Sequence, residues 1–170
     1  MAPAFRNIGS NWEHGRLEVF QERRACEICL RTLHELRWML PALPPDAPLA
    51  IGGALSGDPY VLPSTMAELS LREAGWRAEN FGVGIPVETL CTAVTKVRPK
   101  LVWLSVSAID DAAAWVERFK LLRAAATDAG AAVVLGGRAL SEEIRKELDY
   151  TAYCDTFRHL ATLATALRAP

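Results

Sequence analysis

The sequence predicts an α/β fold with a doubly wound, five-stranded parallel sheet, preceded by a short helical arm. Two observations predict it. From residue 48 onward, short apolar segments of strand character alternate with longer segments of helical periodicity. A proline-rich segment, 41–48, separates them from a helical pattern nearer the N-terminus, because proline stops a helix. We therefore expect a helical arm over 1–41 and an α/β domain over 48–170.

The arm shows helical periodicity over 17–40, after a shorter helix expected to end near Gly15. In the α/β domain the expected strands are 49–55, 76–82, 100–107, 131–137 and 151–155. The expected helices are 64–75, 86–97, 110–128, 140–148 and 156–168. Ser64 suits the cap of the first of these helices, and Gly75 suits its end.

Strands that alternate with helices imply a parallel sheet covered on both faces. Right-handed crossovers then favour a flavodoxin-like sheet of order 2-1-3-4-5. Such sheets bind ligands at the carboxyl ends of their strands, beside the point where the strand order reverses. The loops expected there are 57–63, 105–110 and 136–138.

Composition excludes several classes of function. The net charge of −1 argues against direct contact with nucleic acid. The apolar runs are too short for a membrane span, and the N-terminus lacks a signal peptide pattern, so we expect a cytoplasmic protein without a membrane partner. No catalytic motif is present, and Asp110 and Asp111 suit the start of a helix, so we expect no enzyme. Cys26 and Cys29 form a CxxC pattern, which we interpret as two ordinary cysteines of a helix.

The three expected loops resemble the signature segments of the cobalamin-binding domain family. The family's first loop reads Asp-x-His-x-x-Gly, where this chain has Asp-Pro-Tyr-Val-Leu-Pro over 58–63. Its third loop carries a Ser-x-Leu pattern or a relative, and its fourth carries Gly-Gly. The resemblance covers about 48–168 and implies cobalamin as the cofactor. The loop residues that it implies in cofactor binding are Asp58, Tyr60, Ser105, Ser107, Gly136 and Gly137.

The arm resembles the helical cap of MerR-type cobalamin photoreceptors, which are transcription regulators. Those proteins carry a tryptophan, nine residues, and then Glu-His. Here Trp12 is followed at the same spacing by Glu22 and then Arg23, so the histidine is replaced. The resemblance implies that Trp12 and Glu22 face the cofactor and that the arm is a partial helical bundle.

The family's cobalt ligand is also replaced. The resemblance implies that Tyr60 stands where a histidine coordinates cobalt in place of the cofactor's own dimethylbenzimidazole, and that Asp58 would orient that ligand. A neutral phenol, with an ordinary pKa of about 10, is a poor metal ligand. Pro63 replaces the glycine that lets the backbone pass close to the cofactor's nucleotide tail.

Three alternatives for the ligand stay open. In the first, cobalamin binds with no protein ligand or with Tyr60 as a weak one. In the second, the pocket is degenerate and holds no corrin. In the third, another tetrapyrrole, such as haem, is held by His14, His34 or His159. The glycine pairs, the serines and Asp58 also suit ordinary turns and caps in any doubly wound fold.

The function expected from the resemblance is a sensory or regulatory domain, part of transcription regulation, with degenerate cobalt ligation. The alternatives are a corrin-free module for protein interaction or dimerisation and a corrinoid shuttle subunit for methyl transfer. The expected partners are a corrinoid or none, further copies in a homo-oligomer, and a DNA-binding domain or protein.

Overall fold

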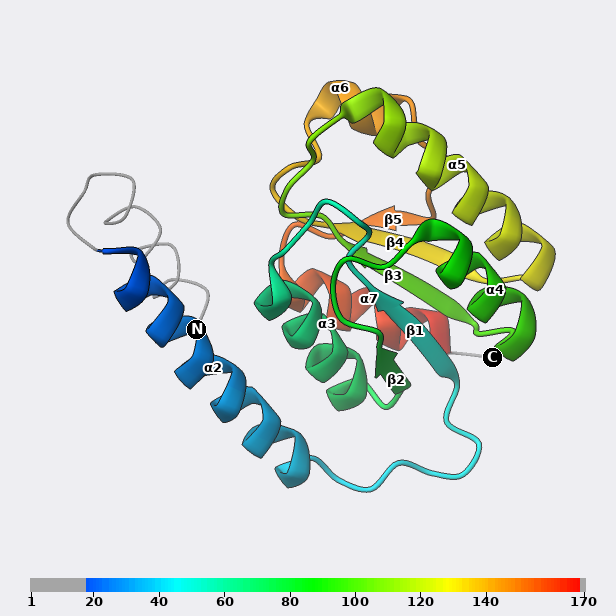
Figure 1. The fold of residues 1–170 in the computed structure, drawn as a ribbon. Helices are drawn as coiled ribbons and strands as arrows, with labels where there is room; N and C mark the ends of the chain where they lie inside the picture. The colour runs from blue at the N-terminus through cyan, green and yellow to red at the C-terminus, as the bar shows by residue number, and fades with distance from the viewer. Residues whose placement is uncertain (1–17, 169–170) are drawn as a thin grey trace. The chain divides into compact units, whose positions relative to one another are not determined.

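The computed structural model describes residues 18–168 and places a five-stranded parallel sheet at the centre of the α/β part (Figure 1). The strand order is β2-β1-β3-β4-β5, which confirms the predicted flavodoxin-like topology. The strands are β1 (Leu49–Gly53), β2 (Arg77–Asn80), β3 (Leu101–Ser105), β4 (Ala132–Gly136) and β5 (Ala152–Tyr153). The order reverses between β1 and β3, where Ala50 lies opposite Leu101.

Helices cover both faces of this sheet. They are α3 (Val61–Glu73), α4 (Val87–Val97), α5 (Ala112–Ala129), α6 (Glu142–Lys146) and α7 (Phe157–Arg168). Helix α3 packs beside α7 on one face, and α4 packs beside α5 on the other, as Figure 1 shows. Both faces of the central strand β3 are therefore buried, which explains its almost entirely apolar sequence.

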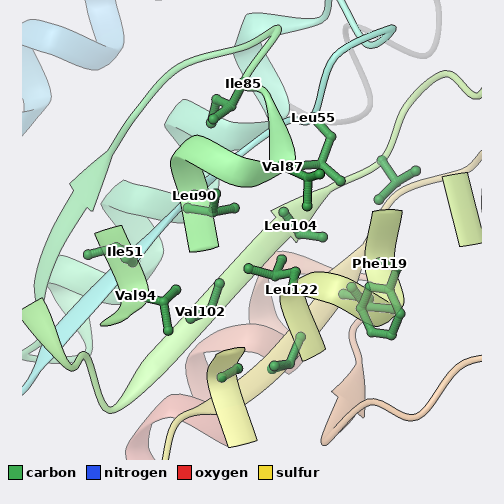
Figure 2. Close-up of a cluster of buried hydrophobic side chains, with 14 of the residues drawn as sticks. Ile51, Leu55, Ile85, Val87, Leu90, Val94, Val102, Leu104, Phe119 and Leu122 are labelled. Atoms are coloured by element: carbon green, nitrogen blue, oxygen red, sulfur yellow. The ribbon is translucent and has the colours of Figure 1, made fainter. Parts of the chain in front are cut away.

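The side chains of β3 alternate between two apolar cores. Val102 and Leu104 enter the core beneath α4 and α5, which Figure 2 shows with Phe119 and Leu122 from α5. Leu101 and Trp103 enter the core beneath α3 and α7. This alternation follows from the two-residue repeat of a strand. The second core contains most of what is unusual about the candidate site.

Local signals in the sequence set most of the helix ends. The Asp111 carboxylate accepts a hydrogen bond from the Ala114 N–H at 3.0 Å and caps α5, as its position predicts. Gly75 adopts a positive φ of 85° just after α3. The N–H of Gly75 then bonds the Arg72 carbonyl, and the N–H of Trp76 bonds the Leu71 carbonyl. That pair of bonds is a Schellman motif, so Gly75 ends the helix as predicted.

The helical arm is represented by α2 (Val19–Met39), in agreement with the helix expected over 17–40. The chain divides into two units between Met39 and Leu40, next to the proline-rich segment. Proline at 41 disfavours a helical conformation of Leu40, which explains where α2 ends. The helix expected to end near Gly15 lies outside the described residues, and the role of 1–41 as a cap stays a prediction.

We predict that Trp76→Phe lowers the free energy of unfolding by about 1–3 kcal/mol, measured by urea denaturation. The Trp76 side chain is buried, and its Nε1–H donates to the Ala164 carbonyl of α7 at 3.0 Å. Phenylalanine removes this bond and leaves a small void. Leu121→Ala on the exposed surface of α5 is the control and should change stability by less than about 0.5 kcal/mol. Equal effects of the two substitutions would contradict the assignment of Trp76 to the core.

Candidate functional site

Six of the predicted site residues lie at the carboxyl ends of the strands. We call this region the carboxyl-end rim, made of the loops 54–60, 106–111 and 137–141 and the last residues of β3 and β4. Asp58 and Tyr60 follow β1, Ser107 follows β3, and Gly137 follows β4. Ser105 ends β3 beside Gly136, which ends β4, because the two strands pair at this position. These six residues therefore lie at the same edge of the sheet, and their role in cofactor binding stays a prediction.

The side chain of Asp58 joins the first loop to the third. Asp58 is only 5% exposed to solvent. Oδ1 accepts the N–H of Tyr60 at 3.0 Å, and Oδ2 accepts the N–H groups of Ser107 at 2.6 Å and Ala108 at 3.3 Å. Hydrogen bonds from N–H groups to a carboxylate are short and strong, and they satisfy a group that would be costly to bury alone. One side chain thus fixes two rim loops together.

Backbone contacts join the third loop to the fourth. The Val106 N–H donates to the Gly136 carbonyl at 2.8 Å, and the Ala139 N–H donates to the Val106 carbonyl at 3.2 Å. Gly137 has a φ of 128°, and a Cβ there would overlap the backbone of Val106. The Tyr153 hydroxyl also donates to the Gly137 carbonyl at 3.1 Å. Glycine is thus required at 137 for close packing of two rim loops.

Tyr60 is the residue before the first turn of α3, with its side chain 45% exposed. The expectation that this loop runs to Pro63 and that Ser64 caps the helix is wrong, because α3 begins at Val61. Proline is tolerated as the third helical residue, since the first four N–H groups of a helix have no partner within it. Ser64 is instead fully buried one turn into the helix.

The sequence did not indicate the buried polar chain that begins at Ser64. The Ser64 hydroxyl donates to Asn80 Oδ1 at 2.9 Å and accepts the Trp103 Nε1–H at 3.2 Å. Asn80 Oδ1 also accepts the Gly82 N–H at 3.0 Å. These contacts connect α3, the end of β2 and the centre of β3. A signal was present, because a tryptophan within a central strand needs a partner for its N–H.

The structure does not test the prediction that residues of the helical arm contribute to the site. Trp12 lies outside the described residues. Glu22 lies on α2, where its carboxylate accepts the Cys26 thiol at 3.2 Å. Burial, together with this hydrogen bond, raises the pKa of the Cys26 thiol to about 12, which suits an unreactive cysteine. The roles of Trp12 and Glu22 toward a cofactor therefore stay predictions.

Among residues 18–168, no cluster of three or more His, Cys, Asp or Glu side chains could hold a metal ion. His159 lies on α7, where its Nδ1 is 3.1 Å from Asp155 Oδ1, as expected of a histidine in a surface ion pair.

None of the described helices combines the length and the apolar character that crossing a membrane requires.

We predict that Asp58→Asn lowers the free energy of unfolding by about 1–3 kcal/mol, measured by urea denaturation. An amide keeps one acceptor oxygen but directs an NH₂ group toward a backbone N–H, so at least one rim bond is lost. Asp110→Asn, on the exposed part of the same rim, is the matched control and should have an effect below about 0.5 kcal/mol. A stability of Asp58→Asn equal to that of the control would show that the rim does not depend on this carboxylate.

Comparison with protein-family models finds no match, and comparison with curated proteins finds none either. Solved structures do match. The monomethylamine corrinoid protein of Methanosarcina barkeri aligns with a TM-score of 0.79 and 17% identity, over 95% of this chain and 77% of that one. A cobalamin-binding protein from Desulfitobacterium hafniense DCB-2 aligns with a TM-score of 0.61 and 16% identity, over 95% and 77%.

The methanol:cobalamin methyltransferase complex MtaBC of Methanosarcina barkeri aligns with a TM-score of 0.62 and 15% identity, over 94% of this chain and 61% of that one. At these identities the likeness establishes the fold, and a shared fold does not by itself carry a shared function. This chain has the fold of cobalamin-binding corrinoid proteins.

Proposed function

We propose that this chain is a sensory or regulatory domain, part of transcription regulation, that keeps the cobalamin-binding fold without ligating cobalt through the protein. One observation carries the proposal. The carboxylate of Asp58, which would orient a cobalt ligand, already accepts three backbone N–H groups within the rim. The residue at the ligand position, Tyr60, adjoins the first turn of α3 and offers only a phenol.

The rim residues therefore do not fit a cobalt ion held by the protein. A ligand histidine is oriented by a second residue that accepts its N–H, and both oxygens of Asp58 already accept backbone N–H groups of the rim. A phenol is a poor metal ligand compared with the imidazole of a histidine. Pro63 fills the place of a glycine in the first turn of α3. These features support a domain that works without a cobalt–protein bond.

The surface of such a domain supports a role in protein interaction. Tyr60, Val61 and Phe81 are 45%, 37% and 41% exposed, although all three are large and apolar. They flank the carboxyl ends of β1 and β2, the edge where ligands bind in this class of fold. We propose a non-enzymatic protein that forms a homo-oligomer and works with a DNA-binding domain or protein. With a net charge of −1, this segment is not expected to contact DNA itself.

A corrinoid shuttle subunit for methyl transfer is the second candidate. The structural likeness to the monomethylamine corrinoid protein favours it, because that alignment covers 95% of this chain. A shuttle needs controlled cobalt ligation, however, and Tyr60 does not supply it. The two candidates differ in whether cobalt gains a ligand from the protein, which can be measured.

We predict that the purified chain, mixed with hydroxocobalamin and passed through a desalting column, shows no absorbance change that depends on Tyr60. A phenol is a poor ligand for cobalt. Tyr60→Phe is the control, because it removes the phenol oxygen and keeps the ring. A spectral shift in the wild type that is lost in Tyr60→Phe would demonstrate a cobalt–tyrosine bond and overturn the proposal.

A further inference from the structure

A tryptophan side chain fills the space between α3 and the sheet, directly beneath the first turn of that helix. Trp103 belongs to the central strand β3 and is only 2% exposed. Its ring lies against Gly52 of the neighbouring strand β1, where a Cβ would overlap the indole. The absence of a side chain at Gly52 is what makes room for the bicyclic ring.

The indole is fixed in orientation as well as buried. Its Nε1–H donates to the Ser64 hydroxyl at 3.2 Å, and that hydroxyl donates in turn to Asn80 Oδ1 at 2.9 Å. The Trp103 Nε1–H and the Ser64 hydroxyl therefore each have a partner. The contact with Ser64 holds one edge of the indole against α3, one residue after Pro63. A ring held in this way cannot swing aside without breaking a buried hydrogen bond.

Small residues share the buried cluster of the indole with larger ones: the cluster contains Ala50 of β1, Ala67 of α3 and Ala78 of β2 beside Leu71 and Trp76. The flat bicyclic ring occupies the space that Gly52 leaves open. Interiors of proteins are close-packed, so this space has no room for a second ring while Trp103 is present.

We propose that Trp103 is a specificity-determining residue. Its indole occupies a slot that would otherwise accept a planar bicyclic group of a ligand bound at the rim. The bicyclic group that matches the indole in shape is a benzimidazole-type base. In the family that the chain resembles, this base belongs to the nucleotide tail, which passes the position that Pro63 occupies here. With the slot filled, ligands and partners are confined to the outer surface of the rim. The proposal deepens the proposed function, on which it rests.

The test uses the full chain with Tyr60→His, which supplies an imidazole at the cobalt-ligand position. It is compared with Tyr60→His/Trp103→Ala and with the control Tyr60→His/Trp76→Phe, which removes a different buried indole from the same core. Each protein is titrated with hydroxocobalamin and with hydroxocobinamide, which lacks the nucleotide tail and also has an exchangeable axial ligand on cobalt. Absorbance gives the dissociation constants, and circular dichroism verifies the fold.

Opening the slot should tighten cobalamin binding by roughly tenfold or more relative to Tyr60→His alone, since an apolar ring becomes buried. Cobinamide binding and the Trp76→Phe control should not change. The absence of a gain, an equal gain for both corrinoids, or an equal gain in the control would overturn the proposal. If Trp103→Ala does not fold, Trp103→Val, which suits a strand, takes its place under the same criteria.

Failure of this proposal and failure of the proposed function give different results. Cobalt ligation by Tyr60 in the wild type contradicts the proposed function, whatever Trp103 does. Tight binding of cobalamin by Tyr60→His with Trp103 in place contradicts the plug alone, because it shows that the bicyclic base is accommodated without removing the indole.

Discussion

The buried carboxylate of Asp58 is the interaction on which the rim depends. It comes from the loop after β1 and accepts the N–H groups of Ser107 and Ala108 from the loop after β3. A negative charge that is almost excluded from water must be satisfied by donors, and here the backbone supplies them. Because its oxygens accept N–H groups from both loops, Asp58 holds the loops together.

The rest of the site follows from that constraint. Tyr60 donates its backbone N–H to Asp58 and leads directly into α3. Behind that helix, Trp103 occupies the interior next to Gly52. The fold is that of cobalamin-binding corrinoid proteins, and a shared fold does not by itself carry a shared function.

The sequence predicted the fold well, since alternating strand and helix patterns restrict a parallel sheet to few topologies. It predicted the start of α3 poorly, because Pro63 looked like a loop residue and Ser64 like a cap. Proline is in fact compatible with a first helical turn, and Ser64 is buried because Trp103 needs an acceptor. Such a contact joins residues 39 positions apart and could not be derived from local patterns. The family pattern pointed to Asp58, but its three partners became visible only in three dimensions.

Amide hydrogen exchange of Ser107, followed by NMR, tests the central claim most directly. The account predicts that the Ser107 N–H is strongly protected in the wild type, because it donates to the buried Asp58 carboxylate at 2.6 Å. It also predicts that this protection falls in Asp58→Asn while amides of the central strand β3 remain protected. Rapid exchange of Ser107 in the wild type, or equal protection in both proteins, would contradict the claim that Asp58 holds the rim together.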